Sequence, residues 1–196
     1  MKKTFLFILS FAIIGFIFAQ NPKNIKIIES EPIIEKGSKF QDKDEFEKSV
    51  QQFKKVPLGD SLYGIAQYKM AVSYYYQELY DKAAQTLEYL IDNPSDKVPA
   101  STVYNLLGYV YMGKKDHVKA ANILEYALYL TPYNYKLLAA QGRAYIELNE
   151  LEKAEIAIKK AIFCAPTYQY AHFLLGNLYV KQGKIIPAIL AYNYIN

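Results

Sequence analysis

The chain has little of the chemistry that metal sites and most enzymes require. Its 196 residues include one cysteine, two histidines and no tryptophan. One cysteine excludes an internal disulfide and a cluster of zinc-bound thiolates, and two histidines leave little material for a metal site. The sequence also lacks a P-loop, a GxGxxG motif and a GxSxG motif. We therefore expect no metal, no cofactor and no catalytic residues, and we interpret the chain as non-enzymatic.

Strong net charge is also missing. The formal charge is +4 at pH 7, and Lys2 and Lys3, in a segment that we expect to be removed, account for two of these charges. The remaining net charge of 4 − 2 = +2 is too small to indicate binding to nucleic acid, so we expect no nucleic-acid partner. By contrast, 52% of the residues are hydrophobic and 21% are charged, which is typical of a folded protein with a substantial core.

The first 19 residues have the features of a secretory signal. Lys2 and Lys3 precede an uncharged run from Thr4 to Phe18, and Ala19 comes before a polar exit. The run of about 15 residues is shorter than the ~20 that a membrane-spanning helix needs. We predict cleavage after Ala19 and a periplasmic or secreted protein. The alternative is an uncleaved signal that anchors the chain in the inner membrane, the one case in which we expect membrane contact.

Residues 20–42 are predicted to form a flexible linker. Pro22, Pro32 and Gly37 interrupt the segment, its isoleucines occur in isolated pairs among charges, and no period of 3.6 residues is sustained. A short strand at residues 25–28, added to the sheet of a partner, is the alternative that the isoleucines allow.

A repeat of 34 residues dominates the C-terminal half. Agreement of several residue types at one fixed interval is the signature of a repeat architecture. The recurring residues are Gly108, Gly142 and Gly176; Tyr111, Tyr145 and Tyr179; Ala120, Ala154 and Ala188; Ala127 and Ala161; and Pro132 and Pro166.

Each block contains two apolar stripes at helical spacing, separated by a polar turn. The recurring glycine lies within the first stripe, where glycine costs about 1 kcal/mol relative to alanine. We therefore expect it to permit close packing of the two helices. In residues 101–134 the stripes are Val103, Leu107, Val110 and Tyr111, and then Ala120, Leu124, Ala127 and Leu128.

This pattern resembles the tetratricopeptide repeat family. The residues that match its signature are Tyr104, Leu107, Gly108, Tyr111, Ala120, Leu124, Ala127 and Pro132. We predict a partial repeat helix at 43–63, a divergent repeat at 64–100, repeats at 101–134 and 135–168, and a repeat at 169–196 that is truncated in its second helix. The bias towards Lys, Ile, Asn and Tyr also resembles exported proteins of Bacteroidota.

The resemblance implies an all-α, right-handed superhelical solenoid of antiparallel helix-turn-helix repeats. It also implies that the concave face, built by the first helix of each repeat, binds a peptide or a helix of a partner protein in the bacterial envelope. In-frame positions nominate Tyr68, Tyr75, Tyr76, Asn105, Tyr109, Arg143, Tyr170, Phe173 and Asn177 for this surface, with Val72, Met112 and Lys181 beside them.

The carboxylate clamp known in this family is not expected here. Its five in-frame positions require Lys, Asn, Asn, Lys and Arg, and only Lys136 matches. The other four positions carry Tyr68, Val72, Leu106 and Ala140. Aromatic residues offer apolar area and a hydroxyl, so we expect a largely uncharged peptide segment instead.

The last repeat ends in an apolar helix with no polar capping helix after it. Solenoids usually shield their ends, so an unshielded apolar end face predicts an end-to-end contact, a partner or a truncated open reading frame. Our alternative hypothesis is therefore a self-associating or membrane-tethered assembly subunit, a possible homo-oligomer that uses this face. The residues proposed for it are Ile185, Ile189, Tyr192 and Ile195.

Overall fold

The computed structural model describes residues 29–195, with side chains through residue 194. Every regular element in this range is helical, and none of these helices is long and apolar enough to cross a membrane. The predicted signal of residues 1–19 and the alternative strand at residues 25–28 lie outside the described residues.

The helices are α2 (Ser30–Gln41), α3 (Phe46–Phe53), α4 (Tyr63–Tyr76), α5 (Tyr80–Asp92), α6 (Ala100–Gly113), α7 (His117–Leu130), α8 (Tyr135–Glu147), α9 (Leu151–Cys164), α10 (Gln169–Lys181), α11 (Ile185–Tyr192) and the 3-10 turn η1 (Asn193–Ile195).

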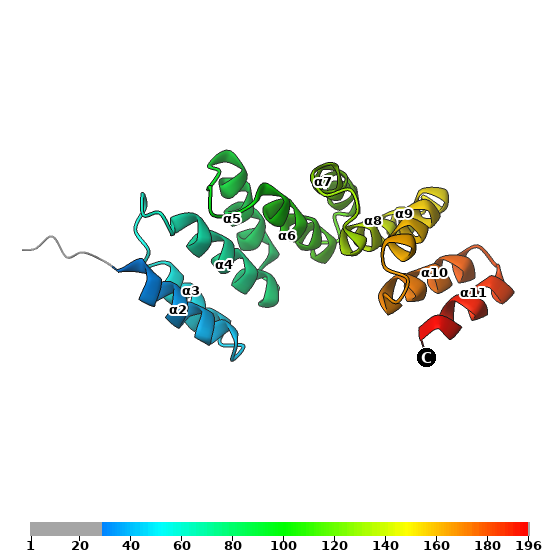
Figure 1. Ribbon diagram of the computed structural model, residues 1–196, viewed down its shortest axis with the longest axis horizontal. Helices are drawn as coiled ribbons and strands as arrows, with labels where there is room; N and C mark the ends of the chain where they lie inside the picture. The colour runs from blue at the N-terminus through cyan, green and yellow to red at the C-terminus, as the bar shows by residue number, and fades with distance from the viewer. Residues whose placement is uncertain (1–28, 196) are drawn as a thin grey trace, which may run out of the picture.

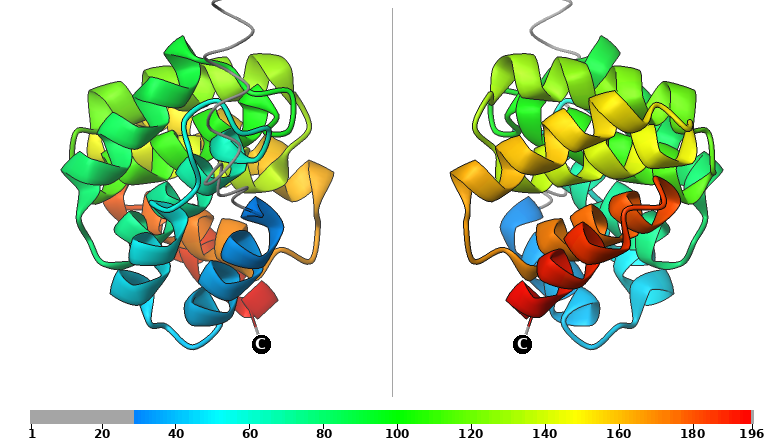
Figure 2. Two further views of the ribbon diagram at one scale, coloured as in Figure 1. Left: turned by 90° about the vertical axis from the view of Figure 1, so that its left-hand side faces the viewer. Right: turned by 90° about the vertical axis from the view of Figure 1, so that its right-hand side faces the viewer.

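Consecutive helices pair into hairpins, and the hairpins stack along the long axis of the molecule (Figure 1). The pairs are α2/α3, α4/α5, α6/α7, α8/α9 and α10/α11. In the end-on views of Figure 2, the blue and red ends of the chain both lie low, whereas the green and yellow helices lie above them. The stack therefore curves, and the prediction of an all-α solenoid of helical hairpins is confirmed.

The first and second helices of the hairpins occupy different sides of the curve. Each first helix contacts the first helix of the next hairpin, from α2 through α4, α6 and α8 to α10. Among the described residues, no contacts join α5 to α7 or α7 to α9. Second helices that diverge while first helices touch must lie on the outside. We call the surface of α4, α6, α8 and α10 the inner face, and it is the concave face that the repeat pattern predicts.

The recurring glycines allow the two helices of a hairpin to pack closely. A methyl group on Gly108 would lie 2.5 Å from Leu124 Cδ2, and one on Gly142 would lie 2.5 Å from Ile158 Cγ1. Both partners have no exposed surface, so neither has room to move aside. The same spacing of 16 residues places Gly37 against Phe53 and Gly176 against Tyr192.

The turn inside each hairpin also repeats. One residue in each turn adopts the left-handed conformation, with φ between 57° and 73°. These residues are separated by 34 positions, except where the three-residue insertion after α5 makes the interval 37. They are Asp44, Glu78, Lys115, Asn149 and Gly183.

The prediction of a flexible linker at 20–42 is wrong for residues 30–41, which form α2. Pro32 lies in the first turn of this helix, where its missing N–H has no intrahelical partner to lose. The Gln41 side-chain amide donates 2.8 Å hydrogen bonds to Ser73 Oγ and to the Lys69 carbonyl. Ser73 Oγ also lies 2.7 Å from Ser49 Oγ in the core. The segment predicted as a partial repeat is therefore the second half of a complete hairpin, α2/α3.

Tyr192 differs from its predicted place on the end face. Its ring covers Gly176 on α10, and its hydroxyl donates a 2.7 Å hydrogen bond to Asn177 Oδ1. It takes the position that Leu124 has in α7, 16 residues after the repeat glycine. Tyr192 is thus a packing residue between α10 and α11, because the last hairpin keeps the contact that closes the others.

Candidate functional site

Tyrosines from three hairpins converge on the inner face around a small pocket. The pocket has a volume of about 170 Å³ and draws residues from α4, α6, α8 and α10, together with the first residue of α5. We call it the tyrosine pocket. Its lining consists of Tyr75, Tyr80, Tyr109, Met112, Gly113, Ala140, Arg143 and Tyr170.

The curvature of the stack brings these residues together. Tyr75 on α4 and Tyr170 on α10 belong to hairpins that are not neighbours, yet they line the same pocket. Tyr80 reaches it because Gly113 has no side chain: a methyl group there would lie 2.5 Å from Tyr80 Cε1. The absence of a side chain on Gly113 therefore has a direct effect on the shape of the site.

Two tyrosines of the pocket, Tyr75 and Tyr109, have raised pKa values. Burial raises the pKa of Tyr109 to about 12, and the neighbouring Tyr168, Tyr170 and Tyr75 add to this effect. Burial also raises the pKa of Tyr75, with further contributions from Tyr80 and Tyr76 that the Arg143 charge opposes. The phenols therefore remain protonated donors at neutral pH. The hydroxyl of Tyr109 donates to the Lys136 carbonyl at 3.4 Å, a long hydrogen bond.

Two rows of aromatic rings adjoin the pocket. Towards the N-terminus, Tyr75 meets Tyr76, which stacks on Phe46 of α3 with ring centroids 5.2 Å apart. Towards the C-terminus, neighbouring ring centroids lie 4.8 to 6.4 Å apart. Such pairs offer both apolar area and ring edges to a bound chain. The C-terminal row consists of Tyr135, Tyr168, Tyr170, Phe173 and Tyr192.

The structure brings together part of the set that the repeat pattern nominates. Tyr75, Tyr109, Arg143 and Tyr170 line the tyrosine pocket with Met112, whereas Tyr76 and Phe173 lie in the adjoining aromatic rows. The remaining nominated residues do not line the pocket. Tyr68 and Val72 are half-buried in α4, Asn177 accepts the hydrogen bond from Tyr192, and the Lys181 ammonium donates to the Ile146 carbonyl at 2.7 Å.

Asn105 is a separate case on α6. Its side-chain oxygen is enclosed by protein and has no hydrogen-bond partner within the part of the chain that the structure describes. An unmatched buried acceptor costs about 1–3 kcal/mol. It lies one helical turn before Tyr109, so this unsatisfied atom belongs to the neighbourhood of the pocket.

Sequence reasoning missed Tyr80, and it did not use the strongest signal for Arg143. Tyr80 lies at a hairpin turn, and only the fold reveals that it reaches the inner face. Arg143 was nominated by its position in the repeat, but a stronger signal was available: it is the only arginine in the chain, whose other basic residues are all lysine.

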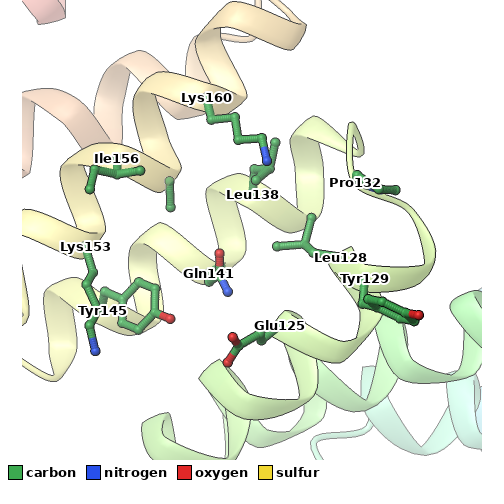
Figure 3. A pocket seen from close by; sticks show the side chains of 11 residues that line it. Glu125, Leu128, Tyr129, Pro132, Leu138, Gln141, Tyr145, Lys153, Ile156 and Lys160 are labelled. Atoms are coloured by element: carbon green, nitrogen blue, oxygen red, sulfur yellow. The ribbon is translucent and has the colours of Figure 1, made fainter.

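A second, larger hollow lies on the outer side, where α7 and α9 diverge (Figure 3). Its volume is about 460 Å³, and α8 forms its floor with Leu138, Gln141 and Tyr145. Tyr129 of α7 is 80% exposed at one edge and Ile156 of α9 is 70% exposed at the other. None of the nominated inner-face residues lines this hollow, which we call the outer groove.

The end face of α11 is apolar and open. Ile185 is 60% exposed and Ile189 is 54% exposed, and Ile186 and Leu190 beside them are also exposed. The side chain of Ile195 lies outside the described residues. The described residues hold no group of three or more His, Cys, Asp or Glu side chains that could bind a metal.

Comparisons with known proteins agree with this architecture. The family model for ChAPs (Chs5p-Arf1p-binding proteins) matches residues 70–195. The BBSome complex member BBS4 of Bos taurus is 26% identical over 129 residues, which cover 65% of this chain. They cover 24% of that protein, so this chain matches only about a quarter of its relative's length.

Solved structures of tetratricopeptide repeat proteins have a similar fold. MamA of Desulfovibrio magneticus RS-1, from residue 41 to its end, superposes with a TM-score of 0.76 at 17% identity, over 85% of this chain and 92% of that one. A crystal structure of MamA gives 0.69 at 22% identity, over 81% and 91%. YrrB, described as a TPR protein with an unusual peptide-binding site, gives 0.67 at 17% identity, over 85% and 84%. These identities establish a shared fold.

Proposed function

Because this chain belongs to the ChAPs (Chs5p-Arf1p-binding proteins) family and has the fold of tetratricopeptide repeat proteins, we propose that it is a non-enzymatic scaffold. Its inner face binds a peptide or a helix of a partner protein. The observation that carries the proposal is the tyrosine pocket, where residues from four hairpins converge on one small concavity.

The chemistry of the inner face supports a peptide as the ligand. Rings on both sides of the pocket can cover apolar side chains, and tyrosine hydroxyls can bond to main-chain carbonyls. The enclosed oxygen of Asn105 lacks a donor, and a main-chain N–H could supply one after rotation of the amide. YrrB, which shares the fold, is itself described as having a peptide-binding site.

Site-specific photocrosslinking tests the face that is used. A photoreactive phenylalanine analogue replaces Tyr170 on the inner face in one variant and Tyr129 on the outer groove in another. We expect a crosslinked partner from position 170 in living cells and no such product from position 129. The same partner appearing only from position 129 would move the binding site to the outer groove.

We also propose that the scaffold acts in the cell envelope. The basic start, the short apolar run and Ala19 support export. Alkaline phosphatase fused after residue 196 is active only outside the cytoplasm, so we expect activity from the whole chain. A fusion without residues 1–19 should be inactive, and equal activity in the two fusions would overturn the assignment.

A second candidate function follows from the open end face. Exposure of Ile185 and Ile189 on one helix favours a self-associating subunit that contacts its neighbour through α11. The double variant Ile185→Lys, Ile189→Lys should then reduce the mass measured by light scattering. An unchanged mass, equal to that of one chain in both proteins, would exclude this assembly.

A further inference from the structure

The tyrosine pocket is built to hold one negative charge. We propose that it binds a single carboxylate of the partner segment, with Arg143 as the cation and the surrounding tyrosine hydroxyls as additional donors. This inference rests on the proposed function, because it names the chemical group that the inner face recognises in a bound peptide.

Every ionisable or hydroxyl group in the pocket is a hydrogen-bond donor, and the Tyr109 hydroxyl would turn from the Lys136 carbonyl, 3.4 Å away, to reach an anion. Tyr75, Tyr80, Tyr109 and Tyr170 supply four phenols and Arg143 supplies a guanidinium, while no Asp or Glu lines the pocket. A guanidinium can hold a carboxylate through two parallel hydrogen bonds. The pKa values of Tyr75 and Tyr109 lie above the ordinary value of 10.0, so both phenols are protonated at neutral pH, act as donors and do not repel an anion.

Arg143 is available for such a partner. It is exposed and forms no ion pair with any carboxylate in residues 29–194, including Glu147, which lies four positions later on α8. Several lysines, in contrast, pair with acidic residues on their own helix or at its start. Examples are Lys39 with Glu35, Lys153 with Glu150 and Lys159 with Glu155. The charge that faces the pocket is therefore left for a ligand.

The size of the pocket fits a carboxylate and a short stem. Its volume of about 170 Å³ is less than half of the 460 Å³ of the outer groove. This is too little for a helix, but it accommodates an acidic side chain or the end of a chain. The aromatic rows on both sides would then cover apolar residues next to the acid.

The arrangement differs from the carboxylate clamp of tetratricopeptide repeats. Ala140 stands where the clamp has a basic residue, and it lines the pocket as a small wall. The positive charge comes instead from Arg143, three residues later on α8. The pocket has tyrosine hydroxyls in place of asparagine and lysine groups, and Lys136, which keeps its clamp position, does not line it.

The single arginine provides a direct spectroscopic test. In the 15N-labelled protein purified after expression of the full chain, one Nε–H signal belongs to Arg143 and needs no further assignment. The probes are three nonapeptides of Leu, Tyr and Ala, acetylated at the N-terminus. One has a central Glu and an amide end, one a central Gln and an amide end, and one a central Gln and a free carboxylate end.

We expect the Arg143 Nε–H signal to shift in a saturable way when a peptide with a carboxylate is added. The peptide with Gln and an amide end, which has no carboxylate, should bind at least tenfold more weakly than that peptide. A response to the Glu peptide identifies an acidic side chain as the source. A response to the free carboxylate end identifies a chain terminus. Arg143→Gln should remove the preference, Arg143→Lys should restore part of it, and Tyr109→Phe should reduce it without loss of helicity. Lys160→Ala in the outer groove is the matched control and should change nothing.

The failures of the two proposals are distinguishable. Equal affinity of all three peptides, with shifts in the inner-face amides and no effect of Arg143→Gln, would overturn the carboxylate inference and leave peptide binding intact. A preference that persists in Arg143→Gln but is lost in Lys160→Ala would also overturn it. No shift in any inner-face amide with any peptide, together with crosslinking only from position 129, would overturn the proposed function itself.

Discussion

Gly37 lies directly against the ring of Phe53, in the same relationship that Gly108 has to Leu124. The two residues of each pair are 16 positions apart, and they join the first and second helices of one hairpin. A methyl group on Gly37 would overlap the Phe53 ring, which is 1% exposed and enclosed by the core. The first hairpin is therefore closed by the same contact as the later ones.

Gly37→Ala should destabilise the protein despite alanine's better helix propensity. The gain in propensity is about 1 kcal/mol, whereas overpacking of a core costs about 1–3 kcal/mol. We expect a net loss of about 1 kcal/mol in the free energy of unfolding, measured by urea denaturation with circular dichroism. Lys36→Ala, on the exposed side of the same helix, is the control and should change little. Equal or greater stability of Gly37→Ala would contradict the close packing.

Ser73→Ala should weaken the attachment of α2. Ser73 Oγ receives a hydrogen bond from Gln41 and shares one with Ser49, so it joins α2, α3 and α4. Loss of this buried hydroxyl leaves polar groups unmatched, and we expect a cost of about 1–3 kcal/mol. Amide hydrogen exchange should accelerate first in residues 30–41. Thr86→Ala is the control, because it removes a hydroxyl that bonds only within its own helix. In this variant the exchange rate of α2 should equal that of the wild-type protein.

Tyr111→Phe should lower stability at neutral pH. The hydroxyl donates a 2.6 Å hydrogen bond to Glu88 Oε1, while the ring is buried. Because Glu88 is exposed and can be solvated by water after the change, we expect a loss of about 1 kcal/mol. Urea denaturation at neutral pH measures it, and Tyr129→Phe, at a tyrosine that is 80% exposed, provides the control.

The same tyrosine predicts an alkaline loss of stability. The hydrogen bond to Glu88, assisted by burial, raises the pKa of Tyr111 from 10.0 to about 12. Above pH 10 the unfolded chain releases this proton while the folded chain still retains it, so stability falls as the pH rises from 10 towards 12. The fall should be smaller in Tyr111→Phe. Parallel curves for the two proteins across this interval would show that Tyr111 does not contribute.

Tyr192→Lys and Ile189→Lys should have different effects. Tyr192 packs on Gly176 and bonds to Asn177, so its replacement should unfold the last hairpin at a cost of about 3 kcal/mol. Ile189 is 54% exposed, and its replacement should change stability by no more than about 0.5 kcal/mol. Hydrogen exchange in α10 and α11 distinguishes them. Rapid exchange in both variants would show that Ile189 is also a packing residue.

The repeat pattern was sufficient to predict most of the architecture. Because a helical hairpin buries its stripe against the next one, residues such as Gly108, Gly142 and Gly176 recur wherever two helices approach closely. Gly37 is in the same frame, 34 positions before Ala71. The sequence does not reveal its helix because Pro32 and the surrounding charges interrupt the apolar stripe, so that only the second half of this hairpin, within 43–63, is predicted as a repeat helix.

The candidate site was harder to predict than the fold. Tyr109 and Arg143 could be placed on the inner face from their frame, since a helix position fixes the direction of a side chain. The meeting of Tyr75 with Tyr170 depends on the accumulated curvature of the four hairpins from α4/α5 to α10/α11, which no local pattern specifies. The contribution of Tyr80 depends on Gly113, whose effect becomes visible only when both helices are in place.

The divergence of the second helices has a mechanical consequence. The first helices touch one another, whereas α5 does not contact α7 and α7 does not contact α9. Neighbouring hairpins can therefore tilt about the contacts along the inner face. A ligand in the tyrosine pocket would contact both α4 and α10 and would connect these two hairpins across the ones between them. Pulling the two ends of the stack apart would separate α4 from α10 and would release a ligand that joins them.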